Sequence, residues 1–199
     1  EAPSFSRPTI RRLSGHVIDL IAAGEVIERP AAALKELVEN AIDAGATRIV
    51  VALRAGWTDR IDVTDNGCGM SPVELELAVE RHCTSKLQDE RLVQIRTLGF
   101  RGEALPSIGA SARLSITSRT PEADTAWCIR VITPPQPASG PVGTRIVVTD
   151  LFFATPARRK FLKSARVESG HAESVMRRLA LSAPHCAMRV LLDDKVLFD

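Results

Sequence analysis

The chain has 199 residues, of which 45% are apolar and 25% charged, and its net charge is +2. These proportions are close to those of an average soluble globular domain, and they exclude a disordered tail, a collagen-like repeat and a coiled coil. No apolar run approaches the roughly 18 residues that a membrane-spanning helix needs, so we expect no membrane contact. The four cysteines lie far apart, which favours reduced thiols over disulfides or a zinc site.

The N-terminal third is predicted to hold an arm and two helices. Residues 1–14 are polar and lack periodicity, which indicates a flexible N-terminal arm. A first helical pattern covers about 17–27. A second begins at Pro30, whose fixed φ suits the first position of a helix, and it stops before Gly45, a residue type that commonly ends helices.

The next segment is predicted to form a hairpin, a helix and a long loop. β-Branched runs at 49–53 and 61–64 predict the hairpin. Ser71-Pro72-Val73-Glu74 has the pattern of a capping box with proline at the first helical position, and it predicts a helix that reaches about residue 82. Residues 83–102 show no clear periodicity, and a segment of that length inside a compact domain is usually a functional loop or lid.

The second half of the chain mixes strands and helices without a regular βαβ repeat. Its patterns predict a short helix at 103–110, strands near 112–118, 127–133 and 144–150, a surface loop at 134–141, helices over most of 157–183, and two strands between 188 and 198. Such a mixture points to a mixed sheet covered by helices.

The helix that begins at Pro30 carries the first candidate chemistry. Its apolar residues follow helical spacing and form one stripe, composed of Leu34, Leu37, Val38, Ala41 and Ile42. Glu36, Glu39, Asn40 and Asp43 fall on the opposite side. Because Glu36 and Asn40 are four residues apart, they can converge on one ligand, the carboxylate to deprotonate a water and the amide to ligate Mg²⁺. Taken alone, the pattern also fits a solvated helix face.

Two glycine-containing turns add to this helix. The first is Asp65-Asn66-Gly67-Cys68-Gly69-Met70, in which the aspartate can accept a hydrogen bond from the amine of a base and the glycines let the backbone approach a flat ring. An ordinary Asp-Asn-Gly turn is the alternative. The second turn, within residues 98–105, places two glycines before a helix start, where backbone N–H groups can bind an anion. Neither a Walker A loop nor a Gly-x-Gly-x-x-Gly motif occurs.

In this order the three motifs resemble the ATPase superfamily shared by gyrase, Hsp90-type chaperones, sensor histidine kinases and MutL. From about residue 13 onward the chain looks like the N-terminal ATPase domain of the MutL family, on the strings IAAGEVIERP (21–30), ELVENA (36–41), TSK (84–86), GFRGEAL (99–105) and TPARRKFL (155–162). The resemblance implies an α+β, two-layer sandwich of the Bergerat type, a largely antiparallel sheet covered on one face by helices. The ATPase domain would span 15–199, without the transducer and C-terminal dimerisation domains that follow it in the family.

The resemblance also implies a role for each site residue, with ATP and Mg²⁺ as the cofactors. Glu36 would be the general base, Asn40 would ligate the metal, and Asp65 would bind the adenine amine. The other residues expected to bind the nucleotide are Gly67, Gly69, Met70 and Thr144 near the base, and Thr84, Ser85, Lys86, Gly99, Phe100, Arg101, Gly102, Glu103 and Ala104 at the phosphates.

The implied function is DNA mismatch repair, driven by slow ATP hydrolysis that is weak in the isolated fragment. Few groups would surround the γ-phosphate, which explains slow turnover. ATP would order the lid at 83–102 and convert a monomer into a homodimer. The implied partners are a mismatch-recognition protein, a downstream nuclease or helicase, and DNA, and the implied location is the bacterial cytoplasm.

Weak, sequence-independent DNA contact is also predicted from charge. Residues 151–181 hold seven basic side chains against two acidic ones, and the basic residues are Arg158, Arg159, Lys160, Lys163, Arg166, Arg177 and Arg178. Such a patch can neutralise phosphates in a salt-sensitive way, although a solvated helix face fits it equally well.

Two alternative functions stay open at this point. The chain could be a nucleotide-gated binding module with negligible hydrolysis. It could also be the ATPase domain of another branch, a topoisomerase or a chaperone, although its lid strings fit those branches poorly.

Overall fold

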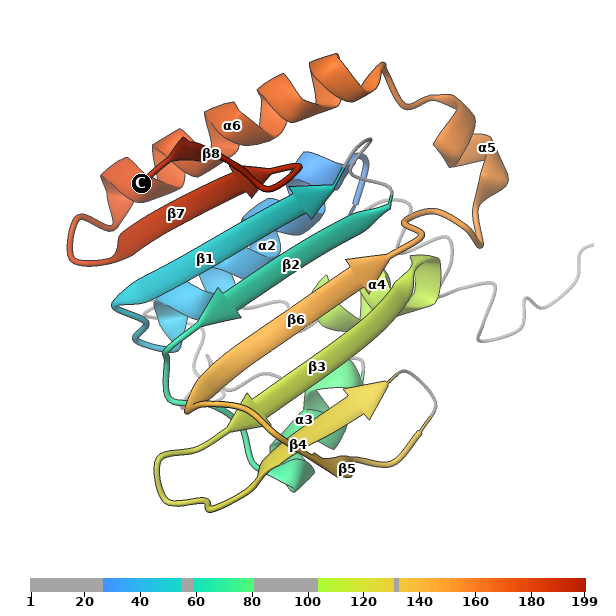
Figure 1. Ribbon diagram of the computed structural model, residues 1–199. Coiled ribbons are helices and arrows are strands. Elements are labelled where there is room, and N and C mark those ends of the chain that lie inside the picture. Colours follow the sequence, from blue (N-terminus) through green and yellow to red (C-terminus); the bar gives the residue numbers. More distant parts are fainter. Residues whose placement is uncertain (1–26, 55–58, 81–103, 131–132) are drawn as a thin grey trace, which may run out of the picture.

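The computed structural model describes residues 27–54, 59–80, 104–130 and 133–199. Within these ranges one eight-stranded sheet and five helices are present (Figure 1). Their bounds are α2 Pro30–Asp43, β1 Arg48–Arg54, β2 Arg60–Asp65, α3 Pro72–Val79, α4 Ala104–Ser111, β3 Arg113–Arg119, β4 Ala126–Arg130, β5 Gln136–Ala138, β6 Gly143–Thr149, α5 Pro156–Lys160, α6 Ala165–Ser182, β7 Ala187–Leu192 and β8 Lys195–Phe198.

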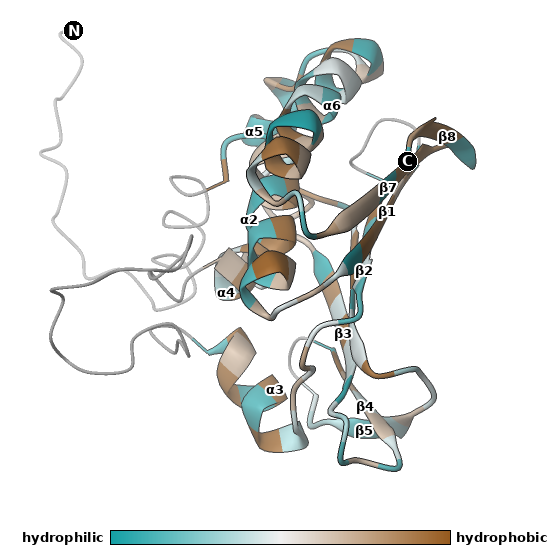
Figure 2. Cartoon of the chain, turned by 90° about the vertical axis from the view of Figure 1, so that its left-hand side faces the viewer, coloured by the Kyte–Doolittle hydropathy of each residue, from teal (hydrophilic) through white to brown (hydrophobic). Residues whose placement is uncertain are grey.

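The strands follow the spatial order β5-β4-β3-β6-β2-β1-β7-β8. Every neighbouring pair is antiparallel except β1 and β7, which run parallel. Helices α2, α3, α4 and α6 lie on one side of this sheet and contact its strands (Figure 2). The predicted two-layer α+β sandwich, largely antiparallel and covered on one face, is therefore confirmed.

Most predicted elements occur close to their expected positions, and two differ. The helix predicted to reach about residue 82 ends at Val79, because Glu80 turns extended with ψ 149°. The predicted loop at 134–141 contains β5, which pairs with β4 at the edge of the sheet. Pro137 is compatible with such a strand because an edge position needs fewer backbone donors. The predicted arm at 1–14, the helix at 17–27 except its last residue, and the lid at 83–102 lie outside the described residues.

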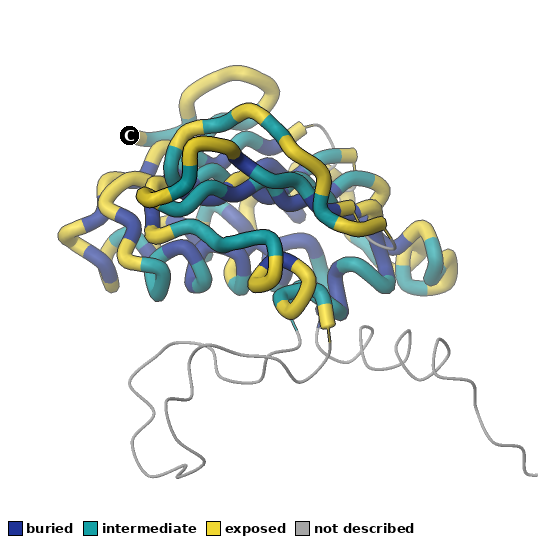
Figure 3. Tube along the Cα trace, turned by 90° about the horizontal axis from the view of Figure 1, so that it is seen from below, coloured by how far each residue is buried: buried dark blue, intermediate teal, exposed yellow. Residues whose placement is uncertain are grey.

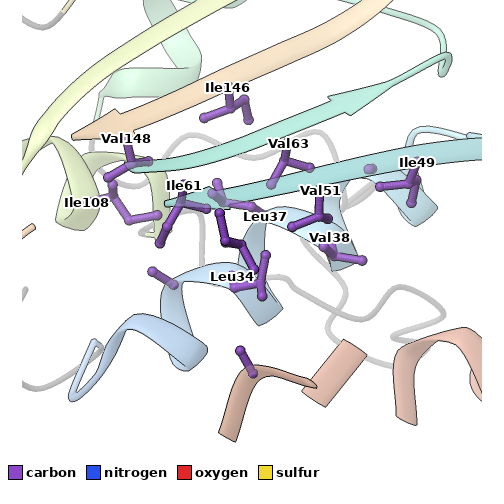
Figure 4. Packing of buried hydrophobic residues seen from close by; sticks show 14 of the residues in the cluster. Leu34, Leu37, Val38, Ile49, Val51, Ile61, Val63, Ile108, Ile146 and Val148 are labelled. Atoms are coloured by element: carbon purple, nitrogen blue, oxygen red, sulfur yellow. The ribbon is translucent and has the colours of Figure 1, made fainter. Parts of the chain in front are cut away.

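The hydrophobic core lies between the sheet and the helices. Leu34, Leu37 and Val38 of α2 are fully buried, which confirms the predicted apolar stripe. In Figure 4 they lie beside alternate residues of the neighbouring strands, among them Ile49, Val51, Ile61 and Val63. The burial map in Figure 3 places the exposed stretches mostly in loops and at helix surfaces. Among the described residues, no helix is long and apolar enough to cross a bilayer.

Shortening a core side chain of α2 should destabilise the domain strongly. We expect Leu37→Ala to lower the free energy of unfolding by about 2–5 kcal/mol, because it removes buried methyl groups and leaves a cavity. Leu181→Ala is the matched control, since Leu181 also lies on a helix but is 83% exposed. Urea denaturation followed by circular dichroism measures both variants, and equal midpoints would contradict the assigned core.

Candidate functional site

Helix α2 presents Glu36 and Asn40 on a side that is partly open. Both are half-buried, whereas the apolar stripe on the sheet side is buried except for Ile42, which is partly buried against the core. The helix begins at Pro30 and ends at Asp43, as the sequence predicts. Four residues correspond to slightly more than one turn, so Glu36 and Asn40 share one face of the helix.

Glu39 does not lie on the open side, contrary to the prediction from helical spacing. It is only 5% exposed, and its carboxylate lies 2.9 Å from Lys35 Nζ, one turn earlier in α2. Helix α2 packs against α6 as well as against the sheet, so more than one of its sides is covered. The buried part of the helix is therefore wider than its apolar stripe, and Lys35 compensates the charge of Glu39.

Asp65 occupies the last position of β2 and is 8% exposed. Its Oδ1 accepts a hydrogen bond of 2.8 Å from the backbone N–H of Gly67. Burial raises the pKa of this carboxyl, and backbone hydrogen bonds from Gly67 and Thr144 only partly offset that rise. The structure thus places a desolvated hydrogen-bond acceptor at the end of a strand.

The Asp65 turn, which we define as residues 65–70, is attached to the C-terminal end of α2. The backbone N–H of Cys68 donates to the carbonyl of Ala44 over 3.0 Å. Asn66 is bound to the start of β1, since its Oδ1 accepts from the backbone N–H groups of Thr47 (3.0 Å) and Arg48 (2.8 Å). Asn66 therefore has a structural role that the motif alone does not reveal.

The two glycines of this turn are required by the packing of the protein itself. A Cβ on Gly67 would lie 2.8 Å from the carbonyl oxygen of Ala44. Gly69 has φ +69°, and a Cβ there would lie 2.0 Å from the carbonyl oxygen of Arg119 on β3. The sequence interpretation attributed both glycines to the approach of a ligand, whereas the structure shows that two protein segments already need them.

Thr144 of β6 lies directly opposite Asp65 of β2, and it is 8% exposed. Its hydroxyl lies 2.8 Å from the hydroxyl of Ser118 on β3. Ser118 also accepts a hydrogen bond of 2.8 Å from the backbone N–H of Met70 in the Asp65 turn. Sequence reasoning missed Ser118, although a signal was present. Leu114 and Ile116 mark every second residue of the strand as inward-facing, and Ser118 is a polar residue at the next inward position.

The phosphate-binding candidates are described only in part. Ala104 is the first described residue after this turn and lies in helix α4, which confirms the predicted short helix but leaves its first turn outside the described residues. Thr84, Ser85, Lys86, Gly99, Phe100, Arg101, Gly102 and Glu103 lie outside the described residues.

The described residues form a line along α2. The Asp65 turn contacts Ala44 just beyond the helix, and Asn40 and Glu36 follow at about 6 Å and about 12 Å back along the helix axis. The Asp65 turn, the amide of Asn40 and the carboxylate of Glu36 therefore follow one another along the helix.

The chain is similar to a known family and to solved structures. The family model described as "Histidine kinase-, DNA gyrase B-, and HSP90-like ATPase" matches residues 27–134. The solved "Aquifex aeolicus MutL ATPase domain complexed with ADP" superimposes with a TM-score of 0.73 at 30% identity, covering 87% of this chain and 63% of that chain.

Curated relatives are more similar in sequence. The "DNA mismatch repair protein MutL" of Azorhizobium caulinodans is 62% identical over 94% of this chain and 31% of its own length. That of Acidiphilium cryptum is 57% identical over 96% of this chain and 33% of its own length. The chain thus spans about a third of these relatives. It belongs to the histidine kinase-, DNA gyrase B- and HSP90-like ATPase family and, within that family, to the ATPase domains of MutL mismatch-repair proteins.

Proposed function

We propose that this chain binds ATP with Mg²⁺, hydrolyses it slowly, and acts as the nucleotide-dependent switch of a DNA mismatch-repair protein. One observation carries the proposal: the buried acceptor Asp65 lies at the end of the helix that carries Asn40 and Glu36. The similar Aquifex aeolicus MutL ATPase domain was solved in complex with ADP, which supports a nucleotide as the ligand of this chain.

In this proposal the base is recognised by Asp65. An ionised carboxylate only accepts hydrogen bonds. It can therefore bind the exocyclic amine of adenine, whereas it repels the carbonyl oxygen of a 6-oxo purine, which is also an acceptor. One of its oxygens already accepts from Gly67, which holds the carboxyl in a fixed direction. Desolvation at 8% exposure strengthens any further hydrogen bond that the carboxyl makes.

Asn40 and Glu36 are proposed to act at the phosphates. Mg²⁺ in nucleotide sites usually has one or two protein oxygen ligands, with phosphates and water as the others, so the amide oxygen of Asn40 fits this metal. When bound, the metal neutralises phosphate charge. The Glu36 carboxylate would then take the proton of the attacking water. Thr84, Ser85, Lys86 and the segment 99–103 are proposed to close over the phosphates.

The role of Glu36 can be tested by separating turnover from binding. We expect Glu36→Ala to lower the rate of phosphate release by about 100-fold or more, because it removes a general base. The Kd for ATP should stay within about threefold, as measured by calorimetry. Glu76→Ala, at an exposed position of α3, should change neither quantity. A wild-type rate equal to that of Glu36→Ala would instead favour a binding module without hydrolysis.

ATP-driven dimerisation, with residues 1–14 reaching the partner subunit, is the proposed output of the switch. A non-hydrolysable ATP analogue at saturating concentration should shift the full chain from monomer to dimer at micromolar protein concentration, as measured by light scattering. Asp65→Asn should stay monomeric at the same analogue concentration, because it loses an acceptor-only group at the base. If the wild-type protein binds the analogue and stays monomeric, this output is wrong.

DNA contact is a second proposed activity, and the structure narrows its candidate surface. Arg159, Lys160 and Arg166 are exposed on α5 and the first turn of α6. Arg177 lies about 16 Å further along α6, and its guanidinium pairs with Glu173 at 2.7 Å. The first part of the predicted patch is therefore the better candidate for binding phosphates.

Charge reversal tests this surface. We expect Arg158→Glu with Arg159→Glu to weaken retention on DNA several-fold at low salt, because fewer phosphates are neutralised. The Kd for ATP should be unchanged. Arg54→Glu with Arg189→Glu gives the same change in net charge on the helix-free face of the sheet and should retain DNA. Equal retention by both double variants would show that net charge, and not this patch, governs DNA contact.

A further inference from the structure

We propose that Ser118 is a positioning residue that makes Thr144 a hydrogen-bond acceptor toward the base and thereby favours a 6-amino purine over a 6-oxo purine. The inference rests on the proposed nucleotide function and adds to it a residue that takes no part in the proposed contacts with ATP. Ser118 lies on the helix-covered face of β3 and is 1% exposed.

Three segments of the chain meet at the Ser118 hydroxyl. The backbone N–H of Met70 donates to it over 2.8 Å, and it donates to the carbonyl of Gly143 over 3.0 Å. The hydroxyl of Thr144 lies 2.8 Å away. Ser118 therefore connects the Asp65 turn to the first two residues of β6.

The number of protons determines the direction of each bond. A serine hydroxyl has one proton and two lone pairs. The Gly143 carbonyl can only accept, whereas the Thr144 hydroxyl can donate or accept, so the assignment that pairs both gives the Ser118 proton to Gly143, and the Met70 N–H takes one lone pair. The contact between the two hydroxyls must then be a donation from Thr144 to Ser118. This arrangement satisfies all four groups, which burial demands.

The consequence concerns what Thr144 can offer to a ligand. With its proton directed at Ser118, the Thr144 hydroxyl has only lone pairs left. Asp65, its cross-strand neighbour, is also an acceptor. The base would therefore face two acceptors side by side, which suits an amine. A 6-oxo purine would place its carbonyl oxygen against this pair.

The backbone around this pair leaves little room for compensation. A Cβ on Gly143 would lie 2.1 Å from the carbonyl oxygen of Asp65, so β6 and the end of β2 are in close contact there. Loss of the Ser118 hydroxyl would free the Thr144 proton to rotate toward the base. It would also leave the Met70 N–H and the Gly143 carbonyl without this partner.

The test measures the Kd of the full chain for ATP and for inosine triphosphate, its 6-oxo analogue, by calorimetry. Wild type should prefer ATP by about tenfold or more, as expected for a hydrogen bond to a charged group. Ser118→Ala should reduce this preference to about threefold, through weaker ATP binding and better tolerance of the 6-oxo base. Ser118→Cys keeps the side-chain size with a weak donor and should show the same loss, which covers the case that Ser118→Ala does not fold.

Ser115→Ala is the matched control, because Ser115 lies on the same strand but on the opposite face, with its hydroxyl 3.4 Å from Cys128 Sγ. It should keep the wild-type preference. An unchanged ratio of the two Kd values in the folded Ser118 variants would overturn the proposal and leave Ser118 a purely structural residue. If wild type binds neither nucleotide, the proposed function itself fails; if it binds both equally, base recognition by Asp65 fails, and the Ser118 proposal fails with it.

Discussion

The arrangement of the site depends on one buried carboxylate, that of Asp65 at the end of β2. A carboxylate removed from water needs hydrogen-bond donors, and here the backbone N–H groups of Gly67 and Thr144 supply them. Donation from Gly67 requires a tight bend after β2, and donation from Thr144 requires β6 to run directly alongside β2. The close backbone contacts at Gly69 and Gly143 follow from this geometry, since a side chain at either position would collide with a neighbouring segment.

Helix α2 connects this carboxylate to the rest of the fold. Its apolar side packs on the sheet, and its partly open side carries Asn40 and Glu36. Its C-terminal end meets the Asp65 turn through the Ala44 carbonyl. Because one rigid helix contributes to the core and to the candidate site, the spacing between Asn40 and Glu36 is set by the rise of the helix and not by loop conformation.

The elements that were predicted well are those whose causes are local. The capping box at Ser71 is present, with Ser71 Oγ accepting from Glu74 N and Glu74 Oε2 accepting from Ser71 N, because four consecutive residues suffice to form it. Edge strand β5 was missed because its three residues carry no pattern of their own and become a strand only by pairing with β4. The burial of Glu39 was missed because helical spacing contains no information about which other parts of the chain pack on α2.

The amino-acid sequence by itself determined the start of α2 at Pro30, the hairpin of β1 and β2, and the ordered motifs that identify the ATPase family. These depend on neighbouring residues or on short strings. Only the tertiary structure decided that Gly69 must accommodate Arg119, that Ser118 contacts Met70, and that Thr144 lies opposite Asp65. Each of these contacts joins residues about 50 or more positions apart, whose meeting follows from the pairing of β3, β6 and β2 and cannot be read from local periodicity.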